Sequence, residues 1–409
     1  MLCAAMTEDE AQRSIRAFYE YVNNQTVFVG KDTCMKSRTH IITQAGQSLW
    51  LDNIQRRELT DGTLKRMIDE DGISGITSNP SIFMNAVSKS NDYDSQIQQL
   101  LTEGKSTAEI YEAITVEDIT AAGQLMLPIF EASGHADGFV SIELNPRHAF
   151  KIEESITEAQ HLMELIALPN IMIKVPGTTE GIRVTQSLLE QGINVNITLL
   201  FDPEYYRLVA QAYITALEKR LERKQDISNV HSVASFFISR LDTQVDPQLD
   251  TIIAQPGEPA QQAIALRGRA AESIARVTFA LYQELFNSER FQKLADDGAR
   301  QQRLLWASTG TKDPAYSDVK YVEGLIAPGT VNTLPPKTIA AFKDHGQSGS
   351  IQNNFAEAPE ALRAISSLGI DLQTIYDELL AAGVTSFEKA YLDLLETISA
   401  KSAALSGRA

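Results

Sequence analysis

The chain has 409 residues, of which 43% are hydrophobic and 22% charged, as in ordinary globular proteins. This length suits one large α/β barrel with additions, or two domains. The formal net charge of −17 disfavours nucleic acid as a partner but leaves room for a local basic pocket that binds an anionic substrate.

Two cysteines, Cys3 and Cys34, give neither a disulfide framework nor a zinc-binding spacing, which suits a reducing compartment. No stretch of the sequence has the length of a membrane span. Residues 1–6 are too short for the apolar core of a signal peptide. We therefore expect a cytoplasmic protein that does not interact with membranes.

Residues 1–46 are predicted to form an N-terminal extension, helical or irregular. Residues 7–10, Thr-Glu-Asp-Glu, form a capping-box pattern that predicts a helix to about Val22. A helix packed on the surface is the simpler interpretation of this segment, and a partner-binding arm is the alternative.

From Leu49 onwards, short apolar runs alternate with longer amphipathic segments. The runs, each predicted to be a strand, lie at residues 49–51, 72–77, 138–144, 170–174, 194–199, 230–237, 304–308 and 330–333. Eight strands alternating with helices predict an α/β fold of the (β/α)8 TIM barrel type over residues 47–336. A doubly wound open sheet is the alternative, because periodicity alone does not show that a sheet closes.

Two further regions stand outside this repeat. Residues 243–260 contain three prolines and predict a long loop after the sixth strand. Residues 337–409 predict extra C-terminal helices that pack on the barrel or over its mouth. One is expected over 371–380 and to end at Gly383, and a capping box at 385–388 begins the next.

Lys174 is the most unusual residue in this pattern. It ends a short apolar run that Pro176 and Gly177 stop, so it is expected in a buried strand. Burial disfavours the charged form of a lysine, which makes a buried amine a candidate nucleophile that forms a Schiff base with a carbonyl group. The alternative is a structural lysine that reaches solvent from the end of the strand.

Polar side chains follow almost every predicted strand, at the end where parallel barrels carry their chemistry. These candidates are Asp52, Asn79, Glu143, Lys174, Asn196, Thr198, Ser235, Arg240, Ser308, Lys312 and Thr333. Taken singly, several have a structural explanation: Asp52 suits a helix cap, and Arg240 suits a surface ion pair. Glu143 is expected to face the barrel interior and to pair with Lys174, either as a catalytic pair or as a structural salt bridge.

Other kinds of site find less support. Residues 308–312, Ser-Thr-Gly-Thr-Lys, lack the upstream glycine spacing of a phosphate loop, so we expect no nucleotide site. The six histidines have no metal-ligand spacing, and His231 is expected in the core. We therefore expect neither a metal nor a cofactor.

Five motifs, taken together and in this order, resemble the transaldolase family. They are Leu-Trp-Leu-Asp at 49–52, Thr-Ser-Asn-Pro-Ser at 77–81, Ile-Lys-Val-Pro-Gly-Thr at 173–178, Asn-Val-Asn-Ile-Thr-Leu-Leu-Phe at 194–201 and Trp-Ala-Ser-Thr at 306–309. The resemblance covers about residues 49–336 and is closest to the longer bacterial-type members with extra C-terminal helices.

The resemblance implies a cofactor-free class I enzyme of the pentose phosphate pathway. Such enzymes move a dihydroxyacetone unit from sedoheptulose 7-phosphate to glyceraldehyde 3-phosphate, giving erythrose 4-phosphate and fructose 6-phosphate. One alternative is a fructose 6-phosphate aldolase, which shares the fold and the lysine but releases free dihydroxyacetone. The other is a non-catalytic sugar-phosphate-binding barrel. In each case the expected partners are small sugar phosphates, and the chain is expected to be a monomer or a homodimer.

The resemblance also implies roles for the residues of the catalytic step. Lys174 corresponds to the lysine that forms the Schiff base. Glu143 corresponds to an acid and base that works through a water molecule, which Thr198 helps to hold. Asp52 corresponds to the group that takes the proton from the donor's hydroxyl as the carbon–carbon bond breaks.

The substrate-binding residues implied by the resemblance are Asn79, Asn196 and Ser235 for the donor's hydroxyl groups, and Arg240 with Ser308 nearby for its phosphate. Shorter members of the family have a second phosphate-binding arginine soon after the seventh strand. This sequence has no arginine there, and Lys312 is the candidate substitute.

Overall fold

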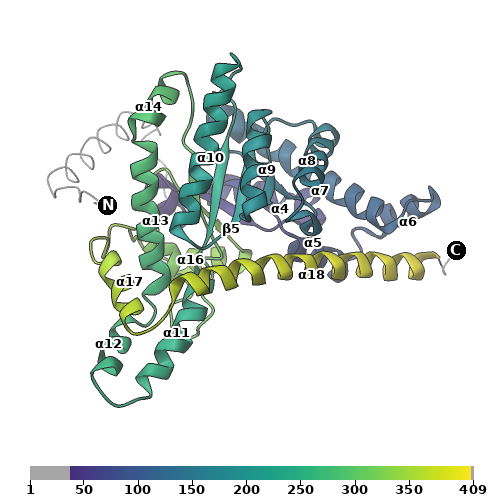
Figure 1. Ribbon diagram of the computed structural model, residues 1–409. Coiled ribbons are helices and arrows are strands. Elements are labelled where there is room, and N and C mark those ends of the chain that lie inside the picture. The colour runs from purple at the N-terminus through teal and green to yellow at the C-terminus, as the bar shows by residue number, and fades with distance from the viewer. Residues whose placement is uncertain (1–36, 407–409) are drawn as a thin grey trace. The chain divides into compact units, whose positions relative to one another are not determined.

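The computed structural model describes residues 37–406 (Figure 1). The predicted helix from residue 7 to Val22 and both cysteines lie outside the described residues. The short helix α2 (His40–Gln44) leads into the first strand. No helix within residues 37–406 is long and apolar enough to cross a membrane.

Eight parallel strands form a closed barrel in the order of the sequence. They are β1 (Ser48–Asp52), β2 (Ile73–Thr77), β3 (Phe139–Glu143), β4 (Ile171–Pro176), β5 (Val195–Leu200), β6 (Ser232–Phe237), β7 (Arg303–Ala307) and β8 (Val331–Leu334). β1 pairs with β2 on one side and with β8 on the other. All eight predicted strands are confirmed, and this closure excludes the open sheet.

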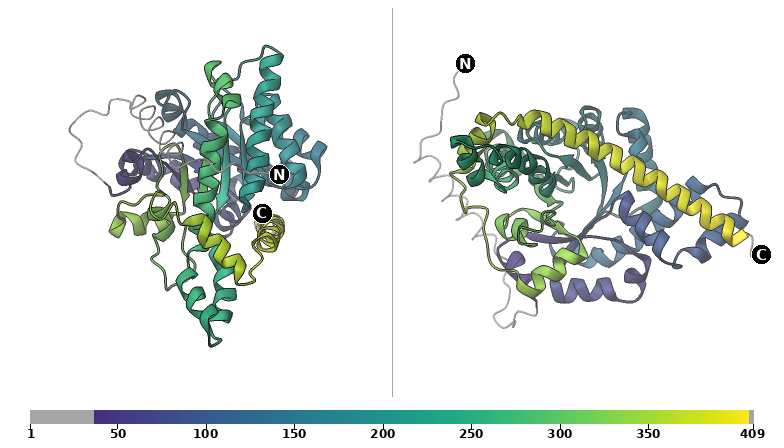
Figure 2. Two further views of the ribbon diagram at one scale, coloured as in Figure 1. Left: turned by 60° about the vertical axis from the view of Figure 1, so that its left-hand side comes forward. Right: turned by 90° about the horizontal axis from the view of Figure 1, so that it is seen from below.

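Helices connect successive strands and surround the barrel (Figures 1 and 2). In chain order they are α3 (Arg56–Thr60), α4 (Thr63–Asp71), α5 (Pro80–Lys89), α6 (Asp94–Thr102), α7 (Thr107–Ala132), the 3-10 helix η1 (Pro146–His148), α8 (Ile152–Ile166), α9 (Thr179–Glu190), α10 (Pro203–Glu222), α11 (Ser239–Ile253), α12 (Glu258–Leu266), α13 (Ala270–Phe286), α14 (Glu289–Asp296), α15 (Lys320–Gly324), α16 (Pro336–His345), α17 (Ala358–Ser367) and α18 (Leu372–Ser406). Their starts follow local signals. For example, the Asp202 side chain accepts a hydrogen bond from Glu204 N, and Pro203 occupies the first turn of α10.

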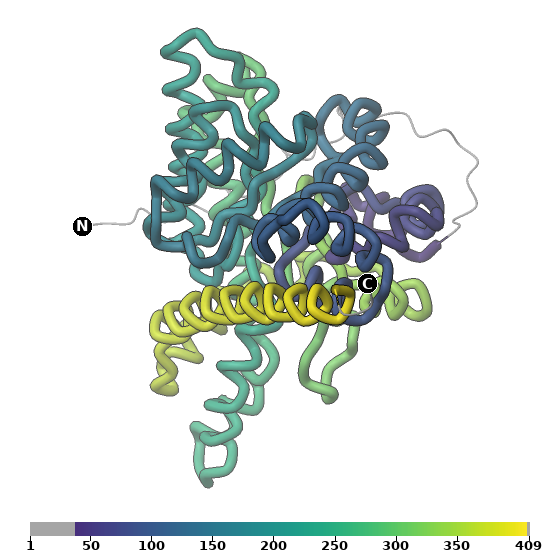
Figure 3. Tube along the Cα trace, turned by 90° about the vertical axis from the view of Figure 1, so that its right-hand side faces the viewer, coloured from purple at the N-terminus to yellow at the C-terminus, as the bar shows by residue number. Residues whose placement is uncertain are grey.

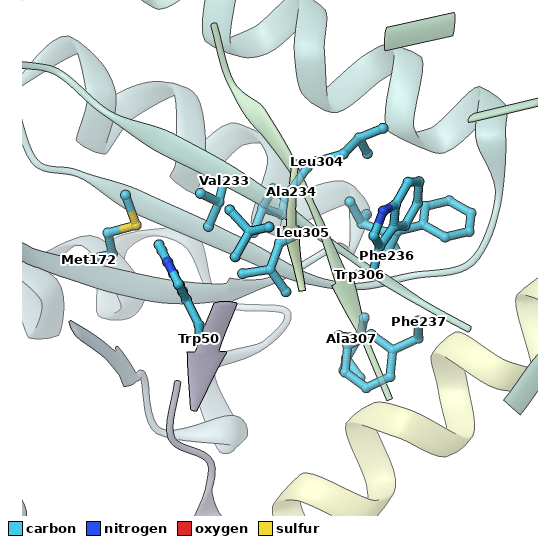
Figure 4. Packing of buried hydrophobic residues seen from close by; sticks show 14 of the residues in the cluster. Trp50, Met172, Val233, Ala234, Phe236, Phe237, Leu304, Leu305, Trp306 and Ala307 are labelled. Atoms are coloured by element: carbon cyan, nitrogen blue, oxygen red, sulfur yellow. The ribbon is translucent and has the colours of Figure 1, made fainter. Parts of the chain in front are cut away.

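Apolar side chains fill the middle of the barrel, next to the polar residues at the carboxyl ends of the strands. Figure 4 shows Trp50, Val233 and Leu305 directed toward one another, and both Trp50 and Leu305 are fully buried. Gly75, opposite Trp50 in the β1–β2 pair, gives the indole its space, because a Cβ there would lie 2.4 Å from the ring. The polar layer above is therefore carried by a close-packed, rigid base.

The prediction of a long loop over residues 243–260 is wrong. α11 continues through Pro247, and α12 follows after a short connection. An internal proline costs a helix about 3 kcal/mol, and tertiary contacts offset this cost. Asp242 accepts a hydrogen bond from Ala271 N (2.8 Å), and Asp246 accepts one from the Tyr316 hydroxyl (2.7 Å).

The predicted helix end at Gly383 is also wrong, because α18 is one continuous helix. A Cβ at Gly383 would lie 2.9 Å from the Leu199 side chain, so this glycine lets the helix approach β5 closely. α18 lies across one end of the barrel, as Figure 2 shows from below and Figure 3 from the side. Near the far end of the helix, the Lys401 ammonium group donates hydrogen bonds to Ser90 O (2.6 Å) and Asp94 Oδ1 (2.7 Å).

Candidate active site

Lys174 lies inside β4, and its residue is only 4% exposed. The strand continues to Pro176, two residues further than the sequence predicts. The ammonium group donates a hydrogen bond to Ser78 O (2.9 Å) and lies 3.2 Å from Glu143 Oε2. The expected pair with Glu143 is therefore present, because the β3–β4 register sets the two residues side by side.

Glu143 ends β3 and is 8% exposed. Burial raises the pKa of its carboxyl group, the charge of Lys174 lowers it and the charge of Asp52 raises it further, with a net shift upward. A carboxyl group with a raised pKa exchanges protons closer to neutral pH than an exposed one does. Glu143 is thus suited to give and take protons beside the amine.

Asp52 ends β1 and accepts a hydrogen bond from the Thr77 hydroxyl (2.8 Å). The Thr77 hydroxyl also lies 2.7 Å from that of Thr333, so residues of three neighbouring strands meet here. Burial raises the pKa of the Asp52 carboxyl group, while the charges of Lys174 and Lys312 and the Thr77 hydrogen bond oppose this shift. The charge of Lys174 thus acts on two buried carboxyl groups, Glu143 and Asp52, whose pKa values are both raised.

A chain of hydrogen bonds crosses the barrel beside Lys174. Asn196 Nδ2 donates to Ser141 Oγ (3.0 Å), and Ser235 Oγ donates to Asn196 Oδ1 (2.6 Å). Ser141 and Asn196 come from the two strands that flank β4, so their side chains meet inside the barrel. These bonds fix the orientation of the Asn196 amide before a ligand binds.

Thr198 lies two residues after Asn196 on β5 and is fully buried. Its hydroxyl has no hydrogen-bond partner among residues 37–406. Buried hydroxyl groups are normally bonded to protein or to water, so this one suits a bound water molecule or a substrate group.

A cluster of positive charge lies at the same end of the barrel. Arg240, in the first turn of α11, is half-buried, and its guanidinium carbon lies 5.2 Å from the centre of the Phe237 ring. Within the described part of the chain, this guanidinium has neither an ion pair nor a hydrogen bond, and burial lowers its pKa. An unpaired guanidinium of this kind suits an anionic ligand.

Lys312 belongs to the same cluster. Much of its side chain is exposed. Partial burial lowers the pKa of its ammonium group, and repulsion from Arg240 lowers it further. Lys337, in the first turn of α16, repels it as well. The sequence prediction missed Lys337, although its place directly after the eighth strand is the signal that could have indicated it.

Two further predicted residues occupy defined positions beside the cluster and the strand ends. Ser308 adopts a positive φ of 54°, and its hydroxyl lies 3.0 Å from that of Ser239 at the start of α11. Asn79 caps α5, because its side-chain oxygen accepts a hydrogen bond from Ile82 N (3.1 Å). The amide NH2 group of Asn79 is not used by this cap.

The C-terminal helix also contributes to the site. The ammonium group of Lys174 lies 5.9 Å from the centre of the Phe387 ring, which α18 carries. The sequence pattern predicted that Phe387 lies on a helix but gave no signal that it faces the lysine. Burial of Phe387 and the close approach at Gly383 bring it there.

His231 is not part of this site. His231 is 5% exposed and packs against Phe139, as expected for a core residue, and burial lowers its pKa to about 4. No group of three or more His, Cys, Asp or Glu side chains within residues 37–406 is arranged to hold a metal ion.

Comparison with known proteins places this geometry in a family. The family model described as transaldolase/fructose-6-phosphate aldolase matches residues 49–398. A transaldolase of Thiobacillus denitrificans is 44% identical over 361 residues, which are 88% of this chain and 99% of that protein. Transaldolases of Mycolicibacterium smegmatis and Thermobifida fusca are 42% and 41% identical, over 87% and 90% of this chain and 95% and 100% of their own lengths. The chain therefore belongs to the transaldolase/fructose-6-phosphate aldolase family.

Proposed function

We propose that this protein is a transaldolase that transfers a dihydroxyacetone unit from sedoheptulose 7-phosphate to glyceraldehyde 3-phosphate through a Schiff base on Lys174. The observation that carries the proposal is the position of Lys174, buried beside Glu143 and within the electrostatic influence of Asp52. Glu143 and Asp52 provide a proton-transfer group for each of the two steps that need one.

The first step forms the Schiff base. The amine of Lys174 attacks the ketone carbon of the donor, and the resulting carbinolamine loses its hydroxyl group as water. Glu143 supplies the proton for this loss, through a water molecule that Thr198 helps to hold. The protonated imine then acts as an electron sink for the next step.

The second step breaks the carbon–carbon bond. Asp52 takes the proton of the donor's hydroxyl group, the bond electrons move into the imine, and an aldehyde leaves. The remaining dihydroxyacetone unit stays on Lys174 until the acceptor aldehyde arrives and the same steps run in reverse. Asn79, Asn196 and Ser235 hold the hydroxyl groups of the donor during these steps.

The basic cluster binds the phosphate group. Arg240 has two parallel N–H groups for a phosphate, and among the described residues its guanidinium has no ion-pair or hydrogen-bond partner. Lys312 takes the place of a second arginine, and Ser308 adds a hydroxyl group next to the start of α11.

We further propose that residues 47–336 form the catalytic barrel and that residues 337–409 complete its mouth. The contact between Lys174 and the Phe387 ring supports this division of roles. A cytoplasmic location fits a substrate that is a cellular sugar phosphate. The chain is expected to act as a monomer or a homodimer. Light scattering of the purified protein tests the oligomeric state.

Borohydride trapping with fructose 6-phosphate tests the central proposal. Reduction fixes an adduct of the size of dihydroxyacetone or of the whole ketose to the peptide that contains Lys174, which mass spectrometry identifies. A folded protein without any adduct refutes the Schiff base and favours a non-catalytic sugar-phosphate-binding barrel.

The choice between transfer and simple cleavage needs a second assay. With fructose 6-phosphate and erythrose 4-phosphate together, a transaldolase forms sedoheptulose 7-phosphate. A fructose 6-phosphate aldolase instead accumulates free dihydroxyacetone, whether or not an acceptor is present. We expect transfer, because relatives that are 41–44% identical over 87–90% of this chain are named transaldolases.

A further inference from the structure

A pocket of about 250 Å³ lies where α7, α8 and α18 meet the end of β3. Its inner end is formed by buried Thr115 and Glu143, whereas Ala108 in its wall is exposed. A water molecule occupies roughly 30 Å³ in the liquid, so the pocket has room for several. The pocket therefore extends from the protein surface to the end of β3.

Glu143 belongs to both this pocket and the barrel interior. Its carboxylate lies 3.2 Å from the Lys174 ammonium group, and the residue is also part of the pocket lining. Of the other pocket residues, Ile142 belongs to β3 as well, and the rest lie on α7, α8, α18 and the segment after β3. Water in the pocket thus reaches Glu143 from the side of α7 and α8 and does not pass Arg240 and Lys312.

A hydrogen-bonded pair forms part of the pocket wall. His148 Nδ1 lies 2.8 Å from Glu158 Oε2, and Asn145 N donates to Glu158 Oε1 (2.9 Å). The His148 and Glu158 side chains are 26% and 23% exposed, so both reach solvent as well as the pocket. Burial raises the pKa of Glu158, which makes this carboxyl group better able to hold a proton.

The reaction proposed above requires water to move at Glu143, and this inference rests on that proposed function. An alkylammonium group and a ketone combine to give a protonated imine and one water molecule, with no net change in protons. That water forms beside Glu143, and hydrolysis of the imine consumes another one. While a sugar phosphate fills the mouth of the barrel, water needs a separate route.

We propose that this pocket is the water path of the active site. His148 and Glu158 act on the pocket water and not on the substrate: they exchange protons between that water and solvent. The path removes the water that imine formation releases and returns water for hydrolysis. Substrate and water then reach Lys174 from different sides.

Oxygen exchange tests the path directly. In 18O-labelled water, each imine that forms and hydrolyses replaces the ketone oxygen of fructose 6-phosphate, provided that the released water escapes first. The measured quantity is label incorporated per imine formed, with the imine rate taken from rapid borohydride quenching. Protein carrying Lys174→Ala gives the background of spontaneous exchange.

Two substitutions at Thr115 distinguish the effect of the pocket's volume from the effect of the Thr115 hydroxyl group. Thr115→Leu fills the inner end of the pocket and is expected to lower the exchange per imine severalfold, with an unchanged KM for fructose 6-phosphate. Thr115→Val has nearly the size of threonine and is expected to retain the exchange. Ala108→Trp narrows the pocket from an exposed position that does not disturb the core, and it is expected to act like Thr115→Leu.

Glu158→Gln tests the proton exchange, because glutamine keeps the hydrogen bond from Asn145 N but does not titrate. We expect imine formation to slow by about tenfold, a fraction of the usual effect of a catalytic acid or base, with a larger solvent deuterium isotope effect. Glu164→Gln is the matched control, since Glu164 is exposed on α8 and does not line the pocket. It is expected to leave both quantities unchanged.

The outcomes distinguish this inference from the proposed function. Wild-type protein that forms no adduct on Lys174 overturns both. An adduct with normal exchange per imine in both Thr115→Leu and Ala108→Trp overturns the water path alone. A Glu158→Gln protein with the wild-type imine rate and isotope effect removes Glu158 from the proton exchange.

Discussion

Removal of the Arg240 guanidinium is expected to weaken catalysis with phosphorylated donors specifically. The group has no ion pair or hydrogen bond within residues 37–406, and its charge lowers the pKa of Lys312. Arg240→Ala therefore breaks no ion pair; it removes the contact with the Phe237 ring but relieves repulsion between two cations. We expect the midpoint of thermal unfolding of the free protein to stay the same or to rise slightly.

The size of the catalytic loss follows from the bonds that the phosphate would lose. A hydrogen bond to a charged group contributes about 1.5–3 kcal/mol, and a guanidinium offers two of them to one phosphate. We take the lower value, because Arg240 is only half-buried and shares the phosphate with Lys312. The loss is then about 3 kcal/mol, which lowers kcat/KM for fructose 6-phosphate by roughly 150-fold.

The assay compares kcat/KM for fructose 6-phosphate and for unphosphorylated fructose in each variant. Arg240→Ala should spare the reaction of fructose, and Arg240→Lys should recover part of the loss because it keeps the charge without the paired N–H groups. Lys312→Met is the companion variant and is expected to show a smaller loss. Equal losses with both substrates, or a large loss of stability, would refute the assignment of Arg240 to the phosphate.

Three other changes probe the centre of the site. Lys174→Ala is expected to abolish turnover and the borohydride adduct while far-ultraviolet circular dichroism stays native, because Glu143 can protonate when its cation is lost; substantial remaining activity would contradict the Schiff base. Glu143→Gln is expected to slow borohydride trapping by about 100-fold or more, as measured by rapid quenching, and an unchanged trapping rate would exclude it as the proton donor. Thr77→Val removes a hydrogen bond that lowers the pKa of Asp52, so that pKa rises further. Since Asp52 acts as a base only when ionised, the acid limb of kcat/KM against pH should move to higher pH, and a limb that does not move would remove Asp52 from this role.

The barrel, and most of the polar residues at the carboxyl ends of its strands, could be predicted because each strand is marked by an apolar run in the sequence. Apolar runs indicate strands, and in a parallel barrel the residues after every strand gather at one end. Lys174 and Glu143 could be paired in advance for the same reason, since neighbouring parallel strands bring residues at corresponding positions side by side. These inferences need only local sequence and one rule of topology.

The predictions are wrong where contacts between distant parts of the chain override the local sequence pattern. Pro247 and Gly383 normally interrupt helices, but hydrogen bonds around α11 and the close approach of α18 to Leu199 keep both helices continuous. Phe387 lies on α18, far beyond the last strand, where no repeat indicates which side chains face the barrel. The pocket beside Glu143 combines residues of several elements, so no single stretch of sequence predicts it.

The pairing of β1 with β8 has a consequence for how the protein unfolds and refolds. In the closed barrel, every strand has a neighbour on both sides, so its backbone offers no free hydrogen bonds to another molecule. Before β8 is in place, β1 and β7 are open edges with apolar sequences around Trp50 and Trp306, and such edges pair readily with other chains. Refolding at high protein concentration should therefore compete with aggregation, and its yield should rise on dilution.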